Sequence, residues 1–138
     1  MPRDDPRQPA EERTDVGVLI VDDQPFFRSA AREVVGALPG FRALAEASSG
    51  PEAVAAVAEL HPQLVLLDVR MPGMDGIETA RLITASHPGT VVVLISIEDI
   101  IGVPSNARTC GAAAVIRKQD FRPSVLRELW AVHGPHPA

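Results

Sequence analysis

Short aliphatic runs alternate with amphipathic stretches along this chain, and the aliphatic runs predict β-strands. Each run is too short for an ordinary helix and is typical of a strand buried on both faces of a sheet. Residues 41–47 instead alternate apolar and polar positions, a pattern that also favours a strand. The predicted strands cover residues 16–21, 41–47, 64–68, 91–95 and 113–117.

The amphipathic stretches between these strands predict helices. Apolar residues keep roughly helical spacing in most of them, and breaks that contain proline or glycine end them. Gly102 and Pro104 interrupt the stretch after the fourth strand, so we expect a long loop there, followed by a short helix over 104–110. The other predicted helices cover about 25–37, 48–60, 76–86 and 121–133.

Strands that are joined by crossover helices pair in parallel, and the helices then cover both faces of the sheet. The sequence therefore predicts an α/β fold, a doubly wound parallel sheet of five strand–helix units, in one domain over residues 16–133. Residues 1–15 are polar and proline-bearing and are expected to be a disordered tail. Residues 134–138 are expected to be a short C-terminal tail.

The composition of the 138 residues is that of one soluble globular domain, with 46% apolar and 22% charged residues. A net charge of −5, without any cluster of Lys and Arg, argues against direct nucleic-acid binding. No apolar run is long enough to cross a membrane and no signal peptide is evident, so we expect a cytoplasmic location. Cys110 is the single cysteine, which excludes an internal disulfide and a cysteine-based metal site.

Polar residues of particular kinds stand at the ends of four of the five predicted strands. Because the carboxyl ends of parallel strands meet at one edge of the sheet, where ligands bind, we expect these residues to converge. Asp68 taken alone could be a turn former or a helix cap, but turns do not explain why four strands end in this way. The residues are Asp22, Asp23, Asp68, Ser96 and Lys118.

These residues form a chemically consistent group. Three nearby carboxylates repel one another and need a cation, and their hard oxygens suit Mg²⁺. An ionised Asp68 could attack phosphorus and form an aspartyl phosphate. Lys118 and Ser96 could then donate hydrogen bonds to the phosphoryl oxygens. The residues therefore predict a phosphoryl-acceptor site that works with Mg²⁺.

Four sequence motifs coincide with these strand ends. They are Val21-Asp22-Asp23-Gln24-Pro25, Leu66-Leu67-Asp68-Val69-Arg70-Met71-Pro72-Gly73-Met74-Asp75-Gly76, Leu94-Ile95-Ser96 and Arg117-Lys118. With spacings of 28 residues from Asp68 to Ser96 and 22 from Ser96 to Lys118, they make the chain resemble the receiver domain of two-component response regulators. The resemblance covers residues 16–133.

This resemblance implies a flavodoxin-like fold with strand order 2-1-3-4-5. It also implies that Mg²⁺ is bound by Asp22, Asp23, Asp68 and the backbone carbonyl of Arg70. Asp68 would take a phosphoryl group from the phosphohistidine of a sensor histidine kinase or phosphotransfer protein. Ser96, with Lys118 beside it, would follow that group and shift the segment after the fourth strand between two states.

The resemblance also sets expectations about activity and partners. Such a receiver is not a metabolic enzyme, because its chemistry is limited to self-catalysed phosphotransfer and autodephosphorylation. The downstream protein is not evident from the sequence, and a homodimer is possible. The region around 21–31 looks most like receivers that precede a helix-turn-helix DNA-binding domain, for which no sequence remains here. We therefore expect a stand-alone receiver, with a chain cut from a longer protein as the alternative.

The chain departs from the family's pattern in its switch region. The family usually places an aromatic residue three positions before the lysine, where this chain has Val115. A small aliphatic side chain cannot swing in and out as Tyr or Phe does. Gly102 and Pro104 fall where the family's fourth helix runs, and Pro104 would break an ordinary helix interior. An altered or weak switch is therefore expected.

Two further residues match positions that tune phosphoryl hydrolysis in the family. Arg70 and Glu98 lie two positions after Asp68 and Ser96, respectively. Their opposite charges allow an ion pair across the entrance of the site. Two solvated side chains are the alternative, since an exposed ion pair is worth only about 0–1 kcal/mol.

Two other functions remain open from the sequence. One is a receiver-like interaction module that phosphorylation does not switch, which the departures in the switch region favour. The other is a Mg²⁺-dependent phosphatase with an aspartyl nucleophile, similar to the haloacid dehalogenase family. Such phosphatases place the nucleophile after the first strand and add a cap domain, whereas the best nucleophile here, Asp68, follows the third strand.

Overall fold

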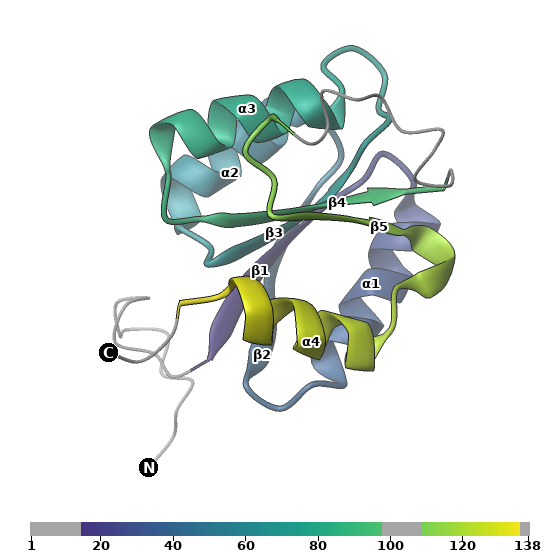
Figure 1. The fold of residues 1–138 in the computed structure, drawn as a ribbon. Helices are drawn as coiled ribbons and strands as arrows, with labels where there is room; N and C mark the ends of the chain where they lie inside the picture. Colours follow the sequence, from purple (N-terminus) through teal and green to yellow (C-terminus); the bar gives the residue numbers. More distant parts are fainter. Residues whose placement is uncertain (1–14, 98–108, 136–138) are drawn as a thin grey trace.

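The computed structural model describes residues 15–97 and 109–135, which form a five-stranded sheet with helices on both faces (Figure 1). The strands are β1 (Val16–Val21), β2 (Phe41–Ala47), β3 (Leu64–Asp68), β4 (Val91–Ser96) and β5 (Ala114–Arg117). The helices are α1 (Pro25–Gly36), α2 (Gly50–Leu60), α3 (Gly76–Ser86), the short 3-10 helix η4 (Lys118–Asp120) and α4 (Pro123–His133). The five predicted strands and four of the five predicted helices are confirmed, with ends that agree within two residues.

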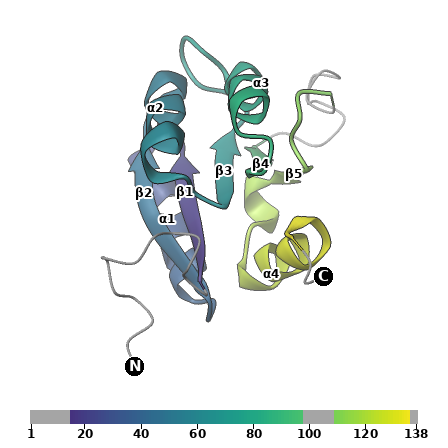
Figure 2. The same cartoon turned by 90° about the vertical axis from the view of Figure 1, so that its left-hand side faces the viewer.

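All neighbouring strands pair in parallel, and Figure 2 shows them side by side in the order β2-β1-β3-β4-β5. This is the predicted flavodoxin-like order. β3 lies between β1 and β4, with Val21 beside Leu67 and Asp68 beside Ile95 in the register. The carboxyl ends of β1, β3 and β4 therefore lie next to one another at one edge of the sheet.

Successive residues of the central strands pack on opposite faces of the sheet. Leu19 and Leu67 belong to an apolar cluster that also includes buried residues of α2 and α3. Ile20 and Leu66 belong to a second cluster that includes buried residues of α1 and α4. Figure 1 shows these two pairs of helices on opposite sides of the sheet. Burial on both faces explains why β1, β3 and β4 are nearly continuous aliphatic runs.

Local hydrogen bonds set the helix boundaries that the apolar pattern left uncertain. The side chains of Ser49 and Asp75 each accept a hydrogen bond from the backbone N–H three residues later, at 3.3 and 2.9 Å. The Ser49 cap explains why α2 begins at Gly50 rather than at residue 48. At the other end of the chain, η4 and an extended Phe121 precede α4, so that helix begins at Pro123 rather than at residue 121.

Some predictions lie outside the described residues. Residues 1–14, 98–108 and 136–138 are not described, and the two predicted tails and the predicted helix over 104–110 fall largely within them. Asp15, predicted to end the N-terminal tail, forms an ion pair with Arg42 at 3.3 Å and accepts a hydrogen bond from Gln63. None of the helices in the described ranges is long and apolar enough to span a bilayer.

The start of α3 lies directly against the end of β3. A Cβ atom at Gly76 would overlap the backbone oxygen of Asp68 and lie 2.8 Å from Cα of Val69. The backbone N–H of Gly76 also donates a hydrogen bond to the carbonyl of Val69 at 2.8 Å. Only glycine allows this close approach, which fixes the backbone next to Asp68.

Replacing Gly76 by alanine should therefore destabilise the fold, because backbone atoms of β3 and the following loop cannot move aside cheaply. We expect Gly76→Ala to lower the free energy of unfolding by about 1–3 kcal/mol, the usual range for overpacking. Urea unfolding followed by circular dichroism measures this change.

Gly36 is the matched control, since it is the last residue of α1, as Gly76 is the first of α3, and a Cβ atom at Gly36 would meet nothing within 4 Å. Gly36→Ala should leave stability unchanged or raise it by up to about 1 kcal/mol. Equal effects at the two positions would contradict the packing argument.

Candidate functional site

The structure brings the predicted site residues together at the carboxyl edge of the sheet. Asp22 and Asp23 follow β1 directly, Asp68 and Ser96 end β3 and β4, and Lys118 follows β5. Four of these five line one cavity of about 120 Å³, while Asp22 is completely buried beside it. The lining residues are Asp23, Gln24, Asp68, Arg70, Ser96, Ile97 and Lys118.

Three carboxylates form an acidic cluster in this site. Asp22, Asp23 and Asp68 each place one oxygen within 4.8 Å of the others. Asp22 is 0% and Asp68 only 7% exposed, whereas Asp23 is exposed. Burying like charges this close together is costly unless a cation offsets their repulsion.

Lys118 supplies a positive charge to this cluster. Its Nζ atom lies 2.7 Å from Oδ2 of Asp22 and 3.7 Å from Oδ2 of Asp68, and its side chain is only 12% exposed. One ammonium group thus faces two buried carboxylates. Because the cluster contains three carboxylates, its charge remains negative with Lys118 in place.

Gln24, the N-cap of α1, and Phe27, in its first turn, both contact Lys118. The sequence alone predicted no role at the site for either residue. Oε1 of Gln24 accepts a hydrogen bond from Nζ at 3.4 Å, and Nζ lies 4.5 Å from the ring centroid of Phe27. More than 90 residues separate these side chains from Lys118. Only the sheet order brings them together, so the local sequence held no signal for these contacts.

Backbone hydrogen bonds orient the buried carboxylates. The N–H of Gln24 donates to Oδ1 of Asp22 at 2.8 Å, and the N–H of Arg70 donates to Oδ1 of Asp68 at 3.4 Å. The guanidinium group of Arg28 donates to the backbone carbonyl of Asp22 at 2.7 Å. Side chains held in this way need little rearrangement to bind a ligand.

Asp68 differs from an ordinary carboxylic acid in its proton affinity. Burial, reinforced by the neighbouring charge of Asp22, raises the pKa of Asp68 to about 6. The ammonium group of Lys118 and the N–H of Arg70 oppose this rise but do not cancel it. A cation that entered the cluster would favour the ionised form of Asp68.

The donor set of the cluster suits a small, hard divalent cation. Oδ2 of Asp22 is buried and has no hydrogen-bond partner among the described residues, although Lys118 forms an ion pair with it. Carboxylate oxygens are the ligands that Mg²⁺ prefers, and Mg²⁺ usually keeps several of its waters. The exposed Asp23 and the adjoining cavity leave room for such waters.

The structure describes some of the residues that were predicted to tune phosphoryl hydrolysis or to act in the switch, but not all of them. Arg70 is exposed and lines the cavity, whereas Glu98 lies outside the described residues, so the predicted Arg70–Glu98 pair stays a prediction. Val115 is half-buried in β5, pairs with Leu94 in the register and packs against the cluster beneath α2 and α3. The position at which the family usually has an aromatic residue is therefore filled here by a packed aliphatic side chain.

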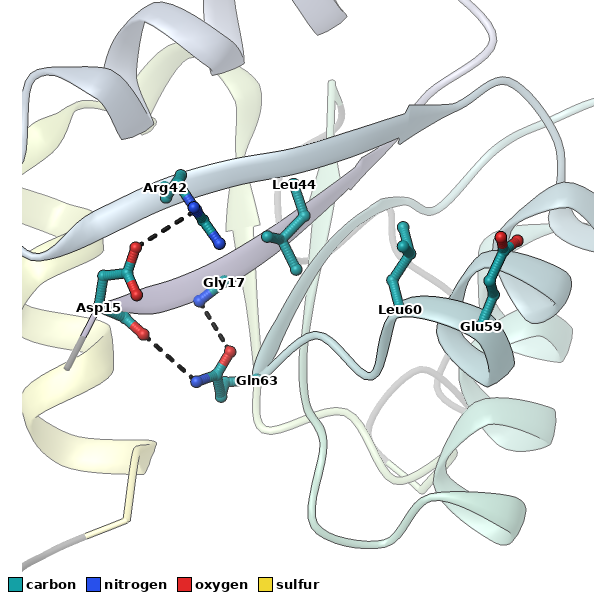
Figure 3. Close-up of a pocket in the computed structure, with 7 residues that line it drawn as sticks. All are labelled: Asp15, Gly17, Arg42, Leu44, Glu59, Leu60 and Gln63. Atoms are coloured by element: carbon teal, nitrogen blue, oxygen red, sulfur yellow. Dashed lines mark hydrogen bonds and ion pairs between the residues drawn. The ribbon is translucent and has the colours of Figure 1, made fainter. Parts of the chain in front are cut away.

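A larger cavity of about 210 Å³ lies at the opposite edge of the sheet (Figure 3). It adjoins Gly17 near the start of β1 and Gln63 just before β3, which are the amino ends of parallel strands. Arg42 and Asp15 form an ion pair there, and the Gln63 amide bonds the backbone of Gly17 and Asp15, as Figure 3 shows. Because these polar groups bond to one another, we interpret them as contacts that fix the start of β1 and not as a second reactive site.

Comparison with known proteins agrees with this geometry. The response regulator receiver domain family matches residues 18–130 of the chain. The chain is 33% identical over 103 residues to the response regulator GacA of Pseudomonas protegens, which covers 75% of this chain and 48% of GacA. The chain therefore spans about half the length of that relative.

Solved structures are similar over nearly all of the chain. The signal receiver domain of NarL from Mycobacterium tuberculosis has a TM-score of 0.78 and 30% identity, covering 86% of this chain and 95% of that one. A chain of the CheX–CheY complex with BeF3 and Mg²⁺ from Borrelia burgdorferi has a TM-score of 0.78 and 27% identity, covering 92% and 96%.

The raised pKa of Asp68 predicts a pH-dependent contribution to stability in metal-free protein. Because the folded chain binds this proton more tightly than the unfolded chain, the contribution is fully present below about pH 4. It is lost as the pH rises through about 6. The loss should be at most about 3 kcal/mol, since one pKa unit is worth about 1.4 kcal/mol and the neighbouring charges of Asp22 and Lys118 interact with that of Asp68 as it titrates.

Asp68→Asn removes this titration. Relative to wild type, the variant should become more stable as the pH rises from about 4 to about 7. Chemical unfolding at several pH values in EDTA measures the difference. A stability difference that does not change with pH would show that Asp68 titrates normally.

Proposed function

Because the chain belongs to the family of response regulator receiver domains, we propose that it is the phospho-acceptor module of a cytoplasmic two-component phosphorelay, with Asp68 as the acceptor. The observation that carries this proposal is the position of Asp68. It ends the central strand β3, lines the cavity and lies 3.7 Å from the ammonium group of Lys118. An exposed turn or capping residue would have none of these features.

In the proposed reaction, an ionised oxygen of Asp68 attacks the phosphorus of a phosphohistidine. A new P–O bond forms, the P–N bond breaks, and the donor imidazole leaves with the electron pair of that bond. Lys118 then donates to the phosphoryl oxygens, which requires a short shift of Nζ away from Asp22. Ser96, at the end of β4 and in the lining of the same cavity, is placed to donate a second hydrogen bond.

We propose Asp22, Asp23, Asp68 and the backbone carbonyl of Arg70 as the residues that hold Mg²⁺. Bound Mg²⁺ offsets negative charge on the phosphoryl oxygens as the transfer proceeds. The protein's own part is to keep Asp22 and Asp68 buried and oriented, with Asp68 in the lining of the cavity and Asp22 beside it. Their hydrogen bonds with the N–H groups of Gln24 and Arg70 support this arrangement.

The proposed donor is a sensor histidine kinase or a phosphotransfer protein, and the downstream partner is a protein. The chain acts as an acceptor and slow autophosphatase rather than as a metabolic enzyme. A homodimer is one arrangement open to the phosphorylated form. The alternative, an interaction module that phosphorylation does not switch, is supported by the packed aliphatic Val115 in place of an aromatic residue.

Incubation with acetyl phosphate and Mg²⁺ should add one phosphoryl group to the wild-type protein, detected by intact-protein mass spectrometry. Asp68→Asn should abolish the addition, because an amide is a poor nucleophile, and EDTA should abolish it in wild type. Asp75→Asn is the matched control. Asp75 is exposed and caps α3, and asparagine is an equally good capping residue.

Phosphorylation of Asp68→Asn at the wild-type level would refute Asp68 as the acceptor. A wild-type protein that is phosphorylated neither by acetyl phosphate nor by a panel of autophosphorylated histidine kinases would favour the unswitched interaction module instead.

A further inference from the structure

An aromatic ring from α1 packs against the only lysine of the chain. The 13 basic residues of the sequence are twelve arginines and Lys118. Nζ of Lys118 lies over the ring of Phe27, 4.5 Å from its centroid. This distance is well inside the range of about 6 Å over which a cation is attracted to the face of an aromatic ring.

Neighbouring residues hold the Phe27 ring in place. Phe27 is partly buried and packs against the apolar cluster beneath α1 and α4. Its centroid lies 6.1 Å from that of Phe121, which directly follows the 3-10 helix that begins at Lys118. The ring therefore contacts the segment that carries Lys118 at two points. Phe26, the preceding residue, is 87% exposed and takes no part in this packing.

From this geometry we propose that Phe27 is a positioning residue, which keeps the ammonium group of Lys118 inside the site while it moves between Asp22 and Asp68. The inference rests on the proposed function, in which Lys118 must follow the phosphoryl group. Hydrogen bonds to oxygen are directional, whereas a cation over the face of a ring is attracted anywhere within about 6 Å of the ring centroid. Phe27 thus holds Lys118 without fixing it to either carboxylate.

Burial strengthens this role. The side chain of Lys118 is 12% exposed, so water competes weakly for its ammonium group. A leucine in place of Phe27 would keep an apolar neighbour but would lose the negative face of the ring. A tyrosine would keep that face. The two substitutions therefore separate the effect of the ring from that of apolar packing.

The single lysine allows the contact to be measured directly. Protein made with 13C-labelled lysine gives resonances from Lys118 alone. Its ε-methylene resonances should lie upfield of their ordinary position, because atoms above the face of an aromatic ring are shielded. Phe27→Leu should return them to that position, and Phe27→Tyr should preserve the upfield shift. Phe26→Leu, the matched control, should leave it unchanged.

Phosphorylation by acetyl phosphate and Mg²⁺ tests the functional part. We expect Phe27→Leu to slow it about 3- to 10-fold at a temperature where the variant is folded, in keeping with the strength of a partly desolvated cation–π contact. Phe27→Tyr should restore most of the wild-type rate, and Phe26→Leu should have the wild-type rate. A purely structural role would lower the stability of Phe27→Leu without moving the lysine resonance.

Two results would overturn the inference. One is an ordinary lysine resonance in wild type that Phe27→Leu does not move. The other is a wild-type phosphorylation rate in Phe27→Leu despite a lost upfield shift. A wild-type protein that accepts no phosphoryl group would instead count against the proposed function, and the lysine resonance would still decide whether Phe27 holds Lys118.

Discussion

The need to offset two buried carboxylates governs the carboxyl edge of this sheet. Asp22 and Asp68 end neighbouring central strands, so the parallel topology places them together and removes them from water. A single ammonium group, that of Lys118, faces both of them. Removing Lys118 would leave both buried carboxylates unpaired, whereas removing either carboxylate would relieve their repulsion, so the effects of the three residues on stability and chemistry should not add independently.

The predictable part of the site is the part that follows from topology alone. Residues at the carboxyl ends of adjacent parallel strands must lie close together whatever their rotamers, which is why Asp22, Asp68 and Ser96 could be placed from the sequence. The choice of partner within the site depends on side-chain direction. Lys118 was expected to serve the phosphoryl group on Asp68, yet its nearest acceptor is Asp22. Spacing along the chain carries no information about such a preference.

The contacts that α1 makes with the site show a second limit of sequence analysis. The apolar spacing of Phe26 and Phe27 predicts a helix but does not tell which ring faces the protein. In the structure Phe27 packs inward and Phe26 is exposed, because the path of the chain after β5 brings Lys118 and Phe121 against the first turn of α1. That path includes the 3-10 helix η4, whose 3 residues are too few to show a helical pattern of apolar positions in the sequence.

The absence of an aromatic residue at position 115 changes how a signal could leave the site. Val115 packs against the cluster beneath α2 and α3, so no ring is available there to turn between a buried and an exposed position. In the function proposed above, a movement that starts at the phosphoryl group would pass through the backbone that carries its contacts. Ser96 is 2% exposed and lines the cavity, and the next residue, Ile97, presents an apolar side chain that is 69% exposed. A small shift of Ser96 would move that side chain with it, which makes the end of β4 the shortest physical route from the buried charges to the surface.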